Sequence, residues 1–61
     1  MSFVRAMMER ENLSLEEARA EWQTALTEIR YALENGEAPE AVLREMFGLE
    51  AEYVEEFLPY L

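Results

Sequence analysis

Carboxylates are the side chains of this 61-residue chain that could do chemistry. All fourteen acidic residues are glutamates and all five basic residues are arginines, and neither cysteine nor histidine occurs. Without thiolate or imidazole groups, the usual nucleophile–base pairs and zinc sites cannot be built. Paired glutamates can act as acid and base or hold a hard cation, but they then need a desolvated cleft or an oxygen-rich loop. The sequence indicates neither, so we expect no catalytic residue, metal or cofactor.

The acidic charge is concentrated in the second half of the chain. Residues 34–61 carry eight glutamates and one arginine, a net charge of −7, whereas residues 1–33 carry −2. An acidic surface repels phosphate backbones and anionic membranes and attracts basic proteins. We therefore expect a basic partner protein and no direct binding to nucleic acid. The glutamates expected to contact that partner, in the manner of phosphates, are Glu50, Glu52, Glu55 and Glu56. The alternative is that the acid serves only solubility.

The short length of the chain favours association. A chain of about 60 residues buries only about 60% of the surface that it exposes when unfolded. Small domains compensate with disulfides, metals or partner chains. This chain has no cysteine for a disulfide, and no cysteine or histidine for a zinc site. Because 51% of the residues are hydrophobic, we expect part of the apolar surface to be intermolecular. The sequence shows no apolar stretch of about 20 residues and no signal peptide, so we expect a cytoplasmic protein that does not enter a membrane.

A long helix is predicted over about residues 15–35. Ser14 and Glu17 form a capping box at its start, and Asn35-Gly36 supplies a left-handed stop at its end. Apolar residues recur between them at spacings of three and four. We expect this stripe to form the interface of a homodimer or higher homo-oligomer through Leu15, Trp22, Leu26, Ile29 and Leu33. Tyr31 lies on the opposite face and is a candidate partner contact. The alternatives are an incidental surface tyrosine and a second packing seam against the first helix or a partner.

Three short helices complete the predicted all-α fold, a single helical domain over residues 1–61. They cover about residues 2–11, 39–47 and 50–58. Pro39 suits the first turn of the second of these helices, and Gly48 ends it. Pro59 limits the last one.

Residues 40–58 have the apolar spacing of a helix-turn-helix unit. With Gly48 as the turn, the apolar positions are filled by Leu43, Phe47, Leu49, Val54 and Phe57. Arg44 takes a position that normally holds a small residue. Proteins that bind DNA neutralise phosphates with Lys and Arg, and residues 45–61 contain neither. The pattern therefore predicts packing of two helices rather than a DNA-binding surface.

The chain also resembles small uncharacterised acidic helical proteins of bacteriophages and other mobile elements. The segments that carry the resemblance are Glu17-Ala18-Arg19, Glu34-Asn35-Gly36-Glu37 and Gly48-Leu49-Glu50-Ala51-Glu52-Tyr53. The resemblance implies an accessory or inhibitor protein and transfers no functional residue.

Our leading hypothesis is therefore a non-enzymatic, self-associating interaction module whose acidic C-terminal helices engage a basic protein. Two other hypotheses stay open at this point. One is a helix-turn-helix transcriptional regulator that binds DNA as an oligomer, and the other is a structural oligomer component.

Overall fold

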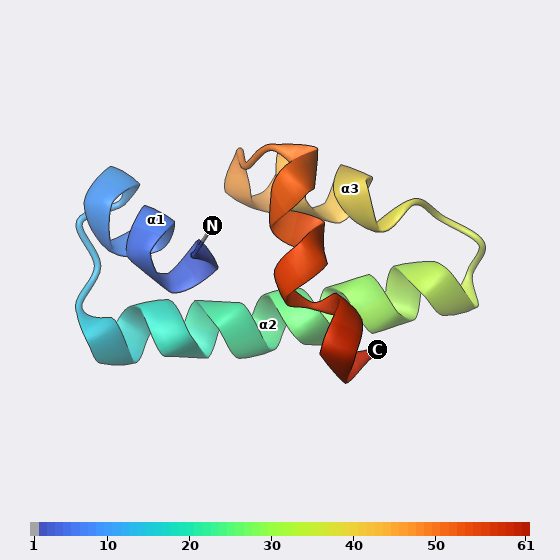
Figure 1. The fold of residues 1–61 in the computed structure, drawn as a ribbon, viewed down its shortest axis with the longest axis horizontal. Helices are drawn as coiled ribbons and strands as arrows, with labels where there is room; N and C mark the ends of the chain where they lie inside the picture. The colour runs from blue at the N-terminus through green and yellow to red at the C-terminus, as the bar shows by residue number, and fades with distance from the viewer. Residues whose placement is uncertain (1) are drawn as a thin grey trace.

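A long α-helix, α2 (Leu15–Glu34), is the axis of the computed structural model, which describes residues 2–61. At 1.5 Å per residue its 20 residues span about 30 Å, close to the 32 Å longest dimension of the molecule. Helix α1 (Phe3–Arg10) packs along the first half of α2, and α3 (Pro39–Val42) packs along the second half (Figure 1). Helix α3 continues without a break into a π-helical turn, η1 (Leu43–Phe47).

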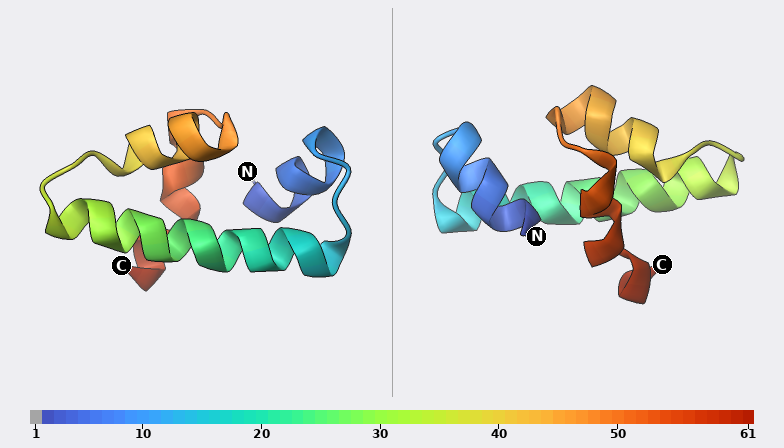
Figure 2. Two further views of the ribbon diagram at one scale, coloured as in Figure 1. Left: turned by 180° about the vertical axis from the view of Figure 1, so that it is seen from behind. Right: turned by 45° about the horizontal axis from the view of Figure 1, so that its top comes forward.

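The C-terminal segment crosses α2 between α1 and α3. It consists of two 3₁₀ helices, η2 (Ala51–Glu56) and η3 (Leu58–Tyr60), and Figure 2 shows it crossing the long helix, behind it in the left view and in front of it in the right view. No strand occurs in residues 2–61. The predicted all-α fold, with one long helix and three shorter helical segments, is confirmed.

Both predicted ends of α2 are confirmed in atomic detail. The Ser14 hydroxyl accepts a hydrogen bond from the Glu17 N–H at 3.1 Å, and the Glu17 carboxylate accepts one from the Ser14 N–H at 2.8 Å. The hydrogen bond from the Ser14 backbone, followed by that with its side chain, lowers the pKa of Glu17. At the other end Gly36 has φ of 72°. The Glu37 N–H then donates to the Ala32 carbonyl at 2.8 Å, as in a Schellman motif.

The last helix differs from the expected α-helix over residues 50–58. The segment is wound as 3₁₀ helices over Ala51–Glu56 and Leu58–Tyr60. Pro59 has no N–H for the carbonyl of Glu55 and restricts Leu58, which disfavours α-helical bonding at the end of the segment. A 3₁₀ helix has three residues per turn. This period places the apolar residues Ala51, Val54, Phe57 and Tyr60 along one side, and it places Glu52, Glu55 and Leu58 along another.

The core is an aromatic cluster enclosed by aliphatic residues. Phe3 meets Phe47 and Phe57 edge-on, with ring centroids 5.2 and 5.6 Å apart. Trp22 stacks on Phe57 at 5.1 Å with an angle of 16° between the rings. Ile29 is fully buried in the same cluster. The core draws on every layer of the fold, since these residues come from α1, α2, η1 and the C-terminal segment.

The apolar positions of the helix-turn-helix pattern are part of this core. Leu43, Leu49, Val54 and Phe57 are buried, and Phe47 packs against them. Gly48 has φ of 65°, in the left-handed region that favours glycine. The prediction that the pattern describes packing is confirmed.

Candidate functional site

The middle of the predicted oligomer interface on α2 is covered by the chain itself. Leu26 and Ile29 are buried in the core, and Trp22 is partly covered by the rings of Phe57 and Tyr60. The prediction that these residues face a second copy is therefore wrong for Leu26 and Ile29, because the short helices fold back over the apolar stripe. Only the two ends of the stripe, Leu15 and Leu33, are exposed.

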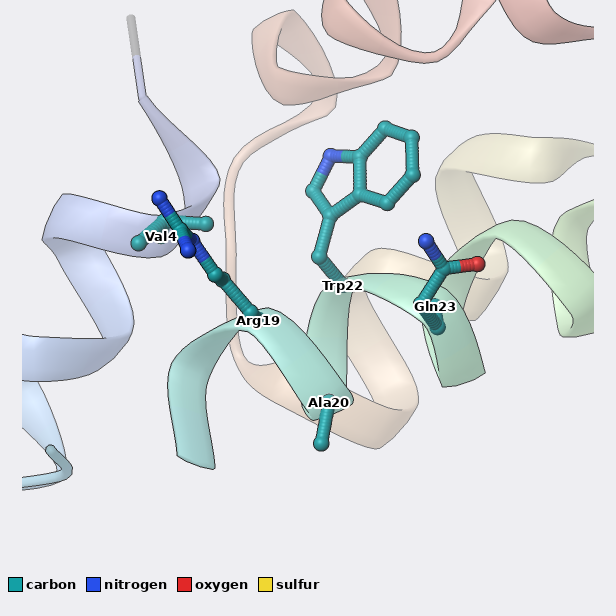
Figure 3. A pocket seen from close by; sticks show the side chains of 5 residues that line it. All are labelled: Val4, Arg19, Ala20, Trp22 and Gln23. Atoms are coloured by element: carbon teal, nitrogen blue, oxygen red, sulfur yellow. The ribbon is translucent and has the colours of Figure 1, made fainter. Parts of the chain in front are cut away.

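A shallow hollow lies beside the uncovered part of Trp22. Four of the side chains that line it come from α2, and one, Val4, comes from α1 (Figure 3). The other lining residues are Arg19, Ala20, Trp22 and Gln23. Arginine is the one charged group in this lining, so the hollow has no electrostatic preference for a basic partner. It does not belong to the acidic surface that the sequence predicts.

The four glutamates of the predicted acidic face differ in their exposure and in their contacts. Glu52 and Glu55 are exposed on the same side of η2. Glu50 is exposed, but its negative charge is offset by Arg10, whose guanidinium lies 3.3 Å from the Glu50 carboxylate. In a 3₁₀ helix consecutive side chains diverge by roughly 120°. Glu56 consequently leaves the face of Glu55 and turns toward α1.

Glu56 is a structural residue and not a free contact group. Its carboxylate accepts a hydrogen bond of 2.6 Å from the backbone N–H of Phe3. This amide is in the first turn of α1, where N–H groups have no partner within the helix. Partial burial of the carboxylate raises the pKa of Glu56, and the hydrogen bond from Phe3 opposes this rise. The prediction that Glu56 contacts a partner protein is corrected, because its side chain joins the two ends of the fold.

Replacing Glu56 with glutamine tests this role through the pH dependence of stability. A raised pKa in the folded state means that the folded chain binds more protons than the unfolded chain, so stability falls as pH rises above 4.5 through the raised value. Glu56→Gln keeps an oxygen acceptor and has no charge. We expect it to reduce this fall and to be at least as stable as wild type at neutral pH, as measured by urea denaturation.

Glu55→Gln is the matched control, since its side chain is exposed and the change in charge is the same. Glu17 does not obscure the comparison. Its pKa is lowered, so its contribution to stability is present above 4.5 and is lost as pH falls below that value. An equal effect of Glu55→Gln and Glu56→Gln between pH 4.5 and neutrality would contradict the assignment.

Tyr31 belongs to a different part of the surface. It is exposed, as the sequence predicts, with 63% of its surface accessible. It lines a groove between the second half of α2 and the α3–η1 helix. Met46, from the π-helical turn, lies in the same lining and is 52% exposed. The structure thus separates Tyr31 from the glutamates of η2 and places it beside a second exposed apolar side chain.

The segment after the Gly48 turn lacks the features of a DNA-reading helix. It is a 3₁₀ helix of six residues and contains no lysine or arginine. Arg44, which takes the small-residue position of the pattern, is exposed and lies 4.0 Å from Glu45.

No helix in residues 2–61 is long and apolar enough to cross a membrane. The same residues contain no cluster of three or more carboxylates arranged to hold a metal ion.

Comparisons with protein families, with curated proteins and with solved structures find no match for this chain. The resemblance to small acidic phage proteins therefore stays a prediction from the sequence. The functional inference rests on the surface of the chain itself.

Proposed function

We propose that this chain is a non-enzymatic, cytoplasmic interaction module whose acidic surface binds a basic partner protein, in the manner of an accessory or inhibitor protein. The supporting observation is that most carboxylates of the acidic half lie outside ion pairs. Of its eight glutamates, only Glu45 and Glu50 lie within 4.0 Å of an arginine nitrogen. Glu56 is engaged with the backbone of α1. The remaining five are free to attract an opposite charge.

Glu52 and Glu55 are the residues of η2 best placed to imitate phosphates. They share the exposed side of the 3₁₀ helix, and neither is paired with an arginine in residues 2–61. Glu50 contributes less, because Arg10 offsets its charge. Exposed charges of this kind act mainly on the rate and specificity of association, and salt weakens them.

Affinity capture with matched variants tests the proposal. Wild type, Glu52→Gln/Glu55→Gln and Glu11→Gln/Glu16→Gln are immobilised, exposed to lysate of the source cell, washed at low or high salt and analysed by mass spectrometry. The last variant removes two exposed charges from the N-terminal half. We expect a basic protein on wild type and on this control at low salt. We expect its loss from Glu52→Gln/Glu55→Gln and at high salt. The same retained proteins on all three chains would contradict the proposal.

We also propose that the chain self-associates, through a surface other than the apolar stripe of α2 that the sequence predicted. The middle of α2 is covered, whereas Leu58, Tyr60 and Leu61 form an exposed apolar group at the C-terminal segment. A dimer that leaves the fold intact has such exposed apolar residues available to it, as well as Leu15 and Leu33 at the ends of α2.

A further inference from the structure

The groove between α2 and the α3–η1 helix combines an apolar floor with an acidic rim. Its volume is about 440 Å³. The apolar side chains in its lining are Tyr31, Ala32, Ala38, Ala41, Val42 and Met46, and the charged ones are Glu28, Glu37 and Glu45.

The apolar part of this groove resembles the centre of a protein interface. Tyr31 and Met46 leave more than half of their surfaces in water, although they adjoin the alanines and the valine of the floor. Tyrosine is among the residues that contribute most to binding at interfaces, and methionine adapts its shape to different partners. Covering both side chains would remove a continuous apolar surface from water, which favours association.

The charges around the groove indicate the partner. Its lining has three glutamates and no base. Two arginines, Arg30 and Arg44, adjoin lining residues in the sequence. Arg44 is exposed and lies 4.0 Å from Glu45, and such a pair contributes little. Arg30 donates to the carbonyl of Tyr60 in the C-terminal segment. The fourteen glutamates of a second copy outnumber its five arginines, so a second copy matches this acidic rim less well than a basic segment does.

The backbone around the groove indicates how that segment binds. Seven of the nine lining residues belong to helices, whose N–H and C=O groups are bonded mainly within the helix, and only Glu37 and Ala38 belong to the link between α2 and α3. An extended peptide therefore has no free strand edge to pair with. Recognition has to occur through side chains, as when an amphipathic helix places one apolar face in a groove between helices.

We propose that this groove binds a basic amphipathic helix of the partner protein. The apolar face of that helix lies on the floor between Tyr31 and Met46, and its Arg or Lys side chains reach Glu28, Glu37 and Glu45. This inference rests on the proposed function and specifies it. It names the segment of the partner that is bound and the surface that anchors it, whereas Glu52 and Glu55 supply attraction over a longer range.

The test uses a synthetic amphipathic helical peptide of leucine and lysine as the probe. The peptide is titrated into the ¹⁵N-labelled full chain and followed by NMR. A second peptide has glutamine in place of every lysine. We expect the lysine peptide to shift the amide signals of Ala38, Ala41 and Met46 in particular, and we expect the glutamine peptide to bind at least about tenfold more weakly.

Matched variants separate the groove from general acidity. Tyr31→Ala and Met46→Ala should each weaken binding roughly tenfold, while Met8→Ala, which truncates an exposed methionine on α1, should leave it unchanged. Glu28→Gln/Glu37→Gln should weaken binding more than Glu11→Gln/Glu16→Gln does. The NMR spectrum of each free variant shows whether it is folded.

Three results would overturn the inference. Shifts confined to Glu52, Glu55 and their neighbours would place the basic partner on η2, which leaves the proposed function intact and removes the groove. Shifts at the groove that depend on the concentration of the chain alone would make a second copy its occupant. Absence of binding by the lysine peptide would reject the groove, while the affinity capture described above judges the proposed function separately.

Discussion

Phe57→Ala is expected to unfold the chain or to leave it barely folded. Phe57 is completely buried, stacks on Trp22 and meets the ring of Phe3 edge-on. Truncating such a residue costs about 3–5 kcal/mol, which is about as much as the whole stability of a small domain. The effect is large because this one ring joins α1, α2 and the C-terminal segment. Circular dichroism during urea denaturation measures it.

Leu58→Ala is the control for that variant. Leu58 is the next residue along the chain and is 57% exposed, so we expect its truncation to change stability by no more than about 0.5 kcal/mol. If Phe57→Ala kept the helical signal and a denaturation midpoint close to that of Leu58→Ala, the placement of the C-terminal segment over α2 would be wrong.

Ile29→Ala and Leu33→Ala should behave very differently, although both residues lie on one apolar stripe of α2. Ile29 is fully buried in the chain's own core, whereas Leu33 is 46% exposed. Truncating a buried isoleucine costs about 2–5 kcal/mol, while a surface change typically costs no more than about 0.5 kcal/mol. We expect a large loss of stability for Ile29→Ala at every protein concentration and almost none for Leu33→Ala.

The protein concentration is the informative variable in that comparison. An interface between copies makes stability depend on concentration, whereas the core of a single chain does not. Similar losses in both variants that diminish as the concentration rises would restore the interface predicted from the sequence. Urea denaturation at several concentrations, with light scattering on the same samples, distinguishes the two.

The parts of the fold that could be predicted are those determined by neighbouring residues. The capping box of Ser14 and Glu17, the left-handed stop at Gly36 and the end of a helix at Gly48 are local chemistry, and all of them occur as expected. The burial of the apolar positions around Gly48 followed from their spacing. The exposure of Tyr31 followed from its place opposite the apolar stripe.

The parts that could not be predicted depend on contacts between distant segments. An apolar stripe looks the same in sequence whether it is covered by a second copy or by the chain's own short helices. Leu26 and Ile29 were therefore predicted to lie at an interface between copies, whereas both are buried within the chain. Consecutive side chains diverge by about 100° in an α-helix and by about 120° in a 3₁₀ helix, so Glu55 and Glu56 take different faces in either winding. Which of the two faces α1 depends on how the C-terminal segment packs. The bond from the Phe3 N–H to Glu56 spans 53 positions, and no local pattern indicates it.

That bond and the Phe3–Phe57 contact have a consequence for how the chain folds. Helices that follow one another in sequence close short loops at little entropic cost, whereas joining Phe3 to Glu56 and Phe57 closes almost the whole chain. These contacts become favourable only once α2 has brought both ends to the same place. We therefore expect the two halves of the molecule to stabilise each other, so that neither residues 2–34 nor residues 35–61 fold alone.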